Sequence, residues 1–310
     1  MKDQSFTDFR CIIVDNGSTD GSLETLPKLD KRFEILKLGE NTGFAKASNI
    51  GVAHCDSKWV AMLNPDAFAR PDWLEKLLAA TSLAPNVTMV GSTQIMALEP
   101  DIYDGLGDCY HISGLAWRSG FGHKVEPFQT CEVFGPCGAG ALYHRETYHR
   151  LGGFDEDFFC YHEDVDLAYR MRLAGGICTQ SSTAIIDHVS SAISGRHSDF
   201  ATYHGTRNRL WTLYKNTPTL LWPLVLPLHI LLTLLLLFRS LLRPATLLPT
   251  LRGLKDGLFG LGKMRSKRRH IQKNIKQIST SQLLKAFAWS PVKALTRGVH
   301  HRPISGKRPT

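Results

Sequence analysis

Three short apolar runs each end directly at polar residues, and this arrangement limits the fold more than any other feature of the chain. The polar residues are Asp15 after residues 11–14, Asn64-Pro65-Asp66 after residues 59–63, and Asp187-His188 after residues 183–186. Short apolar runs that stop abruptly are typical of buried strands in a parallel sheet. Ligands bind at the carboxyl ends of such strands, so we expect Asp15, Asp66 and His188 to share one site.

Segments with helical character alternate with these strands. We expect helices at residues 44–54 and 71–78 and further strands at residues 33–38 and 87–90. After the turn at residues 16–18, Asp20 or Ser22 is expected to cap another helix. Strands that alternate with helices predict an α/β fold in which helices cover both faces of the sheet.

A pair of adjacent carboxylates, Glu163-Asp164, stands at the start of a predicted helix that ends at Gly175-Gly176. One interpretation is electrostatic, because acidic side chains stabilise the N-terminus of a helix. The other is catalytic, because adjacent carboxylates repel and the repulsion raises one pKa toward the range of a general base. The aromatic residues before the pair, Phe158, Phe159 and Tyr161, either stack on a bound acceptor or pack in the core.

Four segments, taken in order, resemble the motifs of the inverting family 2 glycosyltransferases. They are Val14-Asp15-Asn16-Gly17-Ser18-Thr19-Asp20, Asn64-Pro65-Asp66, Gly152-Gly153-Phe154-Asp155 with Glu163-Asp164, and His188. The resemblance covers residues 6–215. It implies the nucleotide-sugar-binding fold called GT-A, an α/β fold with a Rossmann-like mixed sheet. It also implies sugar transfer from a nucleotide diphosphate, with inversion at the anomeric carbon in a single in-line displacement.

The resemblance implies which residues hold the nucleotide. They are Asp15, Asn16, Asn41, Gly43 and Asn64. A carboxylate accepts hydrogen bonds from ribose hydroxyls, and a side-chain amide pairs with the edge of a pyrimidine. Gly43 allows the backbone to approach the nucleotide, and the N-terminus of the helix that follows favours anions.

The resemblance also implies a metal site and a base. Asp66 is the last residue of the family's D-x-D motif, whose first Asp is replaced here by Asn64. Asp66 and His188 would bind Mn²⁺ or Mg²⁺ beside the departing diphosphate. Asp164 would be the base, and Glu163 would orient the acceptor. The alternatives are structural, since an Asn-Pro-Asp turn caps a bend and a lone His after a strand often supports the fold.

The donor and acceptor are implied by the closest branch of that family. Asn64-Pro65-Asp66 and Thr206-Arg207-Asn208-Arg209-Leu210-Trp211 resemble the rhamnosyltransferase-like members. The resemblance therefore implies dTDP-rhamnose as the donor, although relatives also use UDP- and GDP-sugars. The acceptor is expected to be a saccharide or lipid-linked saccharide in bacterial cell-surface polysaccharide biosynthesis.

One departure from the family lies at the N-terminus. Family members usually have a strand and a helix before the Val-Asp-Asn-Gly-Ser motif, but only fourteen residues precede Asp15 here. With this first strand apparently missing, we expect a gap in the sheet with unpaired backbone groups, low stability and weak activity. Either the true start lies upstream, another segment fills the slot, or the chain is inactive. The second hypothesis is thus a truncated, weak or inactive domain that acts as a membrane-docked nucleotide-sugar-binding module.

Residues 220–238 are nearly uncharged and lie between Lys215 and Arg239. At ~1.5 Å per residue they form roughly 28 Å of helix, close to the ~30 Å hydrocarbon core of a bilayer. Pro223 and Pro227 weaken the first half. The segment therefore spans a membrane, re-enters it, lies on its surface, or is the buried core helix of a soluble domain.

The charge of the chain is distributed unevenly. Residues 239–310 hold 17 Lys and Arg against one acid, Asp256, so this part carries +16 and residues 1–238 carry −7 of the net +9. A basic tail indicates an anionic partner. An anionic membrane surface is favoured over nucleic acid, because the tail adjoins an apolar segment and has few interleaved aromatic residues.

These features divide the chain into a GT-A domain at residues 1–216, hydrophobic membrane-associating helices at 217–262 and a basic tail at 263–310. The tail is expected to be poorly structured or to form basic surface helices. The seven cysteines are scattered and form no CxxC pair, which fits a reducing cytoplasm. Residues 1–10 are polar and do not read as a signal peptide. The expected location is the cytoplasmic face of the bacterial inner membrane, peripheral or embedded through residues 220–238.

Overall fold

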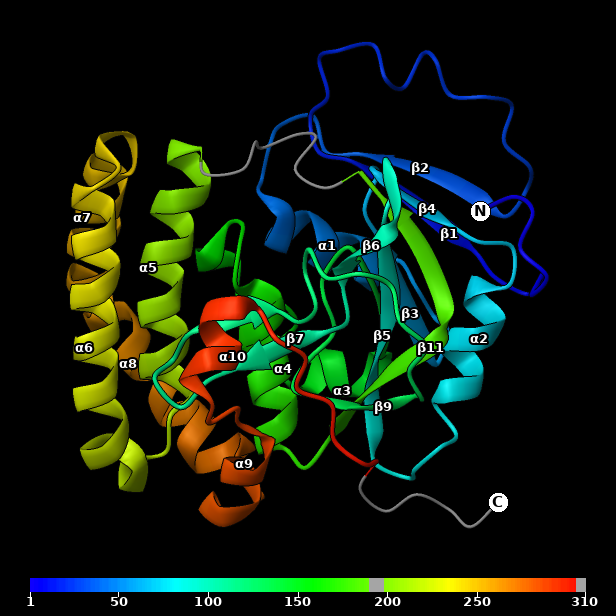
Figure 1. Cartoon of the computed structure of the whole chain (residues 1–310). Helices are drawn as coiled ribbons and strands as arrows, with labels where there is room; N and C mark the ends of the chain where they lie inside the picture. The colour runs from blue at the N-terminus through cyan, green and yellow to red at the C-terminus, as the bar shows by residue number, and fades with distance from the viewer. Residues whose placement is uncertain (190–197, 305–310) are drawn as a thin grey trace.

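The computed structural model describes residues 1–189 and 198–304, and its centre is a mixed sheet of seven strands (Figure 1). The strand order is β3 (Trp59–Leu63), β10 (Gly140–His144), β5 (Val87–Met96), β11 (Ile177–His188) and β4 (Ala67–Ala69), with β6 (Glu99–Gly105) paired to β5 and β9 (Cys131–Val133) paired to β11. Strands β5 and β11 are parallel, whereas β10 is antiparallel to both of its neighbours. The mixed α/β sheet predicted from the sequence is confirmed.

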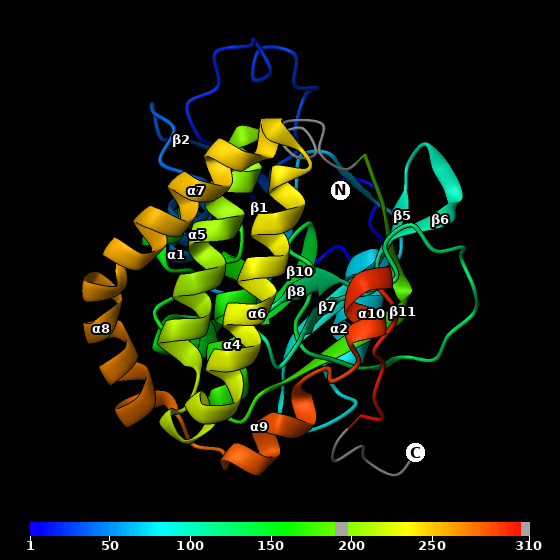
Figure 2. The same ribbon diagram turned by 60° about the vertical axis from the view of Figure 1, so that its left-hand side comes forward.

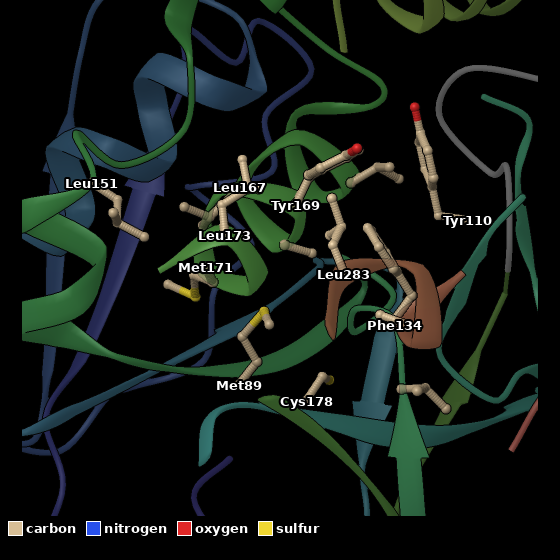
Figure 3. Close-up of a cluster of buried hydrophobic side chains, with 14 of the residues drawn as sticks. Met89, Tyr110, Phe134, Leu151, Leu167, Tyr169, Met171, Leu173, Cys178 and Leu283 are labelled. Carbon is tan, nitrogen blue, oxygen red and sulfur yellow. The ribbon is translucent and has the colours of Figure 1, made fainter. Parts of the chain in front are cut away.

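Hydrophobic clusters cover the two faces of this sheet. The helices of this part are α1 (Phe44–Ala53), α2 (Trp73–Ala80), α3 (Arg145–Arg150) and α4 (Glu163–Leu173). Met89 of β5 packs with residues of α4 such as Leu167 and Met171 (Figure 3), whereas its neighbour Val90 packs with Trp73 of α2. Successive side chains of a strand point to opposite faces, so β5 contributes to both clusters.

Strands β1 (Cys11–Asp15) and β2 (Phe33–Lys37) form a separate two-stranded parallel sheet. Within the described residues, neither strand pairs with the seven-stranded sheet, which agrees with the expected gap. The helix expected after residues 16–18 is wrong, because residues 16–32 form turns. Gly17 and Gly21 have φ angles of 78° and 76°, which interrupt a helix, and Asp20 accepts a hydrogen bond from the backbone of Ser22 instead.

The C-terminal part is helical, and its first four helices lie along one side of the molecule (Figure 1). Its helices are α5 (Asp199–Asn216), α6 (Trp222–Leu241), α7 (Pro244–Phe259), α8 (Leu261–His270), α9 (Thr280–Ala286) and α10 (Pro291–Thr296). Residues 271–304 pack on the sheet-containing part of the chain (residues 1–189), where Phe287 contacts Tyr110 and Tyr169 with ring centroids 5.4 and 5.7 Å apart. Most of the tail is therefore ordered helix and core, and the division into three segments stays a prediction.

Helix α6 is buried along one face and exposed along the other. Val225 and His229 are buried, and His229 donates a hydrogen bond from Nδ1 to the backbone oxygen of Ser113 at 2.8 Å. The opposite face is exposed, with Leu235 and Phe238 58% and 61% accessible. By length and composition alone, Thr219–Leu241 is sufficient to cross a membrane. The alternative of a buried core helix is wrong, because this apolar face has no protein cover among the described residues.

Candidate active site

Four of the five residues predicted to hold the nucleotide, Asp15, Asn16, Asn41 and Gly43, lie beside the end of β1, whereas Asn64 lies at the end of β3 in the other sheet. Asp15 accepts a hydrogen bond from the backbone of Ser18 at 3.0 Å, and hydrogen bonding by Ser18 holds the pKa of Asp15 below its usual value. Oδ1 of Asn16 accepts hydrogen bonds from the backbone and hydroxyl of Thr42 at 2.9 and 3.0 Å. Its Nδ2 donates to Oδ1 of Asn41 at 3.1 Å, and that oxygen also accepts from the backbone of Gly43. The loop is thus fixed before any ligand binds.

Gly43 lies where residues 41–45 touch the loop before α4. Its φ is 85°, and a Cβ at this position would lie 2.5 Å from the ring of Phe159. Two residues on, the backbone of Ala45 donates a hydrogen bond to the carbonyl oxygen of Phe159 at 3.1 Å. A residue larger than glycine at position 43 would therefore push the two loops apart.

Asp66 and His188, predicted as metal ligands, lie next to each other. Nε2 of His188 is 3.2 Å from Oδ1 of Asp66, and Nδ1 is 2.7 Å from Oδ2 of Asp104. A carboxylate only accepts, so a hydrogen bond to Asp104 or Asp66 needs a hydrogen on the ring nitrogen that faces it; Nε2 could turn a lone pair to a cation only if that cation lay between His188 and Asp66. Oδ2 of Asp104 also accepts from Nη1 of Arg118. Asn64, at the end of β3, donates from its backbone to the oxygen of Ala139 at 2.9 Å.

This donor set suits a hard divalent cation. Mg²⁺ and similar ions are usually held by one or two protein ligands together with substrate phosphates. A carboxylate that accepts from the second ring nitrogen of a ligating histidine is the usual support of such a site, and Asp104 has this position. Within residues 1–189 and 198–304, no group of three or more acidic, His or Cys side chains is arranged to hold a metal alone. Substrate oxygens would have to complete the coordination.

The two carboxyl groups at the start of α4 have different hydrogen-bond partners. Asp164 accepts hydrogen bonds from the backbone of Gly138 at 3.2 Å and of Val165 at 2.7 Å. Oε2 of Glu163 is buried and has no hydrogen-bond partner among the described residues. Burial and the charge of Asp164 raise the pKa of Glu163 well above its usual value, whereas burial raises the pKa of Asp164 against the opposing effect of these backbone donors. Of the two, Glu163 therefore holds a proton more tightly, and Asp164 is the more readily ionised member.

Arg118 and Asp108 connect the two parts of the site, and the sequence reasoning missed both together with Asp104. Burial raises the pKa of Asp108 and of Asp164, the charge of Arg118 opposes both increases, and its guanidinium also pairs with Asp104. Burial and the charge of Asp164 raise the pKa of Asp108. The segment holding these residues reads as irregular because its strands, β7 (Asp108–Tyr110) and β8 (Ala116–Arg118), are only three residues long. No periodic signal marks them.

The loop between Phe158 and Glu163 has an unusual backbone. Phe159, Tyr161 and His162 all have φ angles between 64° and 69°, a region that non-glycine residues avoid. Nδ2 of Asn208 in α5 lies 3.0, 2.9 and 2.7 Å from the carbonyl oxygens of Phe158, Cys160 and Tyr161. Asn208 therefore holds the loop in this conformation. Residues 206–211 stood out in the sequence as a family-like motif, but this role of Asn208 was not predicted.

The aromatic residues and arginines near the pair differ in their surroundings. Phe158 is fully buried and packs against Trp211, so core packing explains it. The ring of Phe159 lies near those of Phe200 and His204, at centroid distances of 6.1 and 5.6 Å. The arginines of α4 form buried ion pairs, Arg170 with Asp166 at 2.7 Å and Arg172 with Glu132 at 2.6 Å. These arginines support the fold.

Comparisons with known proteins agree with this geometry. Residues 1–152 match the family model described as glycosyl transferase family 2. N-acetylglucosaminyl-diphospho-decaprenol L-rhamnosyltransferase of Mycobacterium tuberculosis is 27% identical over an alignment of 221 residues, which covers 62% of this chain and 71% of that protein. The putative teichuronic acid biosynthesis glycosyltransferase TuaG of Bacillus subtilis is 39% identical over 79 residues, 24% of this chain and 31% of that protein.

Two solved structures share the fold. The mannosyltransferase of Pyrobaculum calidifontis in complex with GDP-Man and Mn²⁺ aligns with a TM-score of 0.50 and 17% identity, over 94% of this chain and 80% of that chain. GalNAc-T7 with UDP, GalNAc and Mn²⁺ aligns with a TM-score of 0.53 and 13% identity, over 66% of this chain but only 41% of that one. The predicted GT-A fold is confirmed, and the chain belongs to glycosyltransferase family 2.

Proposed function

We propose that this nucleotide-sugar glycosyltransferase transfers a sugar, with inversion, to a lipid-linked saccharide of the bacterial cell surface. The observation that carries the proposal is the set of contacts from Asp66 through His188 and Asp104 to Arg118, whose charge in turn acts on Asp164 of the carboxylate pair. A site for a departing diphosphate and a site for a base are thereby next to each other, as transfer to a hydroxyl requires.

In the proposed reaction Asp164 accepts the proton of the acceptor hydroxyl. The acceptor oxygen forms a bond to the anomeric carbon while the bond from this carbon to the diphosphate oxygen breaks, so a single displacement inverts the configuration. The hydrogen bonds from Gly138 and Val165 support an ionised Asp164. Glu163 stays protonated beside it and donates to the acceptor, because its buried Oε2 has no other partner among the described residues.

Asp66 and His188 would hold Mn²⁺ or Mg²⁺ together with the diphosphate of the donor. When bound, the ion neutralises charge that develops on the leaving diphosphate. Asp104 orients His188 through Nδ1, so it is a positioning residue. Both structural neighbours were solved with Mn²⁺, which supports a divalent ion here.

Asp15, Asn16, Asn41, Gly43 and Asn64 would bind the nucleotide. Likeness to the mycobacterial rhamnosyltransferase supports dTDP-rhamnose as donor and a polyprenyl-diphosphate saccharide as acceptor. A panel of dTDP-, UDP- and GDP-sugars, each offered with Mn²⁺ and a short-chain lipid-linked saccharide, tests the function. We expect sugar transfer from one nucleotide class, with dTDP-rhamnose first. Release of nucleotide diphosphate that needs no acceptor and yields no product would contradict the proposal.

The separate β1–β2 sheet favours a second candidate, a nucleotide-sugar-binding module with little or no turnover. These strands include Asp15, and a two-stranded sheet is marginally stable on its own. Isothermal titration with the donor separates the two candidates. Donor binding in a chain that transfers no sugar to any acceptor would support the module.

Helix α6 would rest on the membrane surface at the cytoplasmic face of the inner membrane. One face of α6 binds the catalytic part through Val225 and His229, so a spanning position would draw that part into the bilayer. The exposed apolar face is free to insert to the depth of the acyl boundary. Flotation of the full chain with vesicles, followed by carbonate extraction, tests this position, and resistance to extraction would indicate an embedded helix.

A further inference from the structure

The basic residues of helix α8 and its extension fall into two groups, one with ion-pair partners and one without among the described residues. Residues 263–273 include six Lys and Arg and no acid. Lys263 and Lys267 lie one turn apart, and both pair with Asp157 of the loop before α4. Lys267 also pairs with Asp155. The other four cations, on the remaining faces of the helix and its extension, have no ion-pair partner in the part of the chain that the structure describes.

These four cations share one pocket. It has a volume of about 420 Å³ and is lined by Arg265, Arg268, Arg269 and Lys273, with Tyr214 and Thr219. No other charged side chain lines it, so the pocket concentrates positive charge. A concave site with several cations and no acid fits a phosphate group, because guanidinium forks match phosphate oxygens.

Arg268 forms the fixed wall of this pocket. Its Nη1 donates to the carbonyl oxygens of Tyr214 and Thr217, both at 2.6 Å, and its Nη2 donates to the hydroxyl of Thr219 at 3.2 Å. The guanidinium also lies over the rings of Tyr214 and Trp222, at 5.6 and 5.4 Å. All of these partners are neutral. They hold the side chain in place and leave its charge available to an anion.

The pocket lies where the exposed apolar face of α6 begins. Thr219 opens the short turn (Thr219–Leu221) that leads into α6, and the next residue, Leu220, is 77% exposed. Figure 2 shows α6 and α7 in front, with α8 beside them. An apolar surface next to a cationic pocket matches the layers of a membrane, in which phosphates lie just outside the acyl chains.

We propose that this pocket binds the phosphate headgroup of an anionic phospholipid when the exposed face of α6 rests on a bilayer. The proposal rests on the membrane position proposed above, and it does not depend on the transfer reaction. None of the residues assigned to donor, metal or base lines the pocket. This separation favours a membrane lipid over the diphosphate of the acceptor.

The test compares two triple variants of the full chain that lose equal charge. R265A/R269A/K273A removes pocket cations, whereas R239A/R243A/R252A removes exposed cations at the end of α6 and in α7. Both are floated with phosphatidylcholine vesicles that contain ~30 mol% phosphatidylglycerol, an anionic content that gives a strong surface potential. We expect the pocket variant to bind these vesicles roughly 100-fold more weakly than the wild type, since each basic residue contributes about fivefold. The control variant should lose clearly less of its affinity for the vesicles. Equal losses, or no loss in either, would overturn the proposal.

A second arm separates the two sources of phosphate. The same variants are floated with neutral vesicles that contain an isoprenyl diphosphate in place of phosphatidylglycerol. A pocket variant that loses binding only to these vesicles would assign the pocket to the acceptor and overturn the headgroup proposal. R269E, compared with R252E, repeats the test with one substitution at an exposed position. Binding is measured without turnover, so an inactive chain does not affect the outcome.

Discussion

Nε2 of His188 lies 3.2 Å from Oδ1 of Asp66, although the two residues are 122 positions apart in the chain. The backbone explains the approach, because β4 and β11 pair antiparallel and His188 stands opposite Ala67, the residue after Asp66. The sheet therefore brings one carboxylate and one imidazole together at its edge. Asp104 holds the other nitrogen of the ring.

The support from Asp104 is testable through metal affinity. Asp104→Asn keeps the shape but removes the charge that fixes the Nδ1–H tautomer of His188. We expect Mn²⁺ binding in the presence of nucleotide diphosphate to weaken by about 10–100-fold, as for other residues that orient metal ligands. Titration followed by electron paramagnetic resonance measures it, with Asp101→Asn, an exposed acid of the same strand, as control. Unchanged affinity in Asp104→Asn would remove Asp104 from the site.

Glu163 predicts an unusual dependence of stability on pH. Burial and Asp164 raise its pKa in the folded state, so the stability that protonated Glu163 provides is present at low pH and is lost as pH rises through the raised pKa. Glu163→Gln keeps a neutral side chain at every pH. Between about pH 5 and 9 we expect a smaller fall of Tm in the variant than in the wild type. Parallel Tm curves would show that Glu163 is ionised in the fold.

Asn208 holds three carbonyl groups of a strained loop, and its removal should release them. We expect Asn208→Ala to lower the free energy of unfolding by about 2 kcal/mol, since the hydrogen bonds that the two N–H groups of Nδ2 share among these carbonyl oxygens are lost. Urea denaturation measures the change. Asn274→Ala, at an exposed position in the π-helical turn Ile271–Ile275, is the control. Equal stabilities of the two variants would contradict the role of Asn208.

Gly43 and Gly39 form a matched pair for the contact between the two loops. Both have φ near 80°, but a Cβ at position 43 meets the ring and carbonyl of Phe159, and a Cβ at position 39 meets nothing within 4 Å. Gly39→Ala should lower the free energy of unfolding by only about 1 kcal/mol, the cost of a left-handed backbone conformation for a residue with a Cβ. Gly43→Ala should lower the free energy of unfolding further, and it should bind nucleotide more weakly in isothermal titration. Equal effects would show that Phe159 moves aside freely.

From the sequence we predicted the residues that follow the apolar runs, but not the residues that connect them. Asp66 and His188 lie together where two apolar runs stop, whereas Asp15 ends β1 in the separate two-stranded sheet, and its place in the same site stays a prediction. Asp104, Asp108 and Arg118 lie on short or bulged strands, where pairing between distant segments decides position and no local period records it. The helix expected after Asn16 failed because two glycines at positive φ form turns.

The basic tail also shows what a single sequence does not reveal. Its charge predicted a poorly structured segment or surface helices, yet Phe287 packs with Tyr110 and Tyr169 in the main core. Charge counts average over a segment, whereas burial depends on single side chains. Lys263 and Lys267 likewise pair with Asp157, a contact across more than a hundred residues that a single sequence does not reveal.

Asp164 is the residue on which the catalytic account depends. We expect Asp164→Asn to keep donor binding and to lower the rate of sugar transfer by about 10²–10⁴-fold, the usual contribution of a general base. Rapid-quench measurement of product formation in a single turnover, with saturating donor, Mn²⁺ and lipid-linked acceptor, tests this most directly. Asp72→Asn, at the half-buried N-cap of α2, whose side chain makes no capping hydrogen bond, should keep the wild-type rate. Transfer by Asp164→Asn at the wild-type rate would contradict the account.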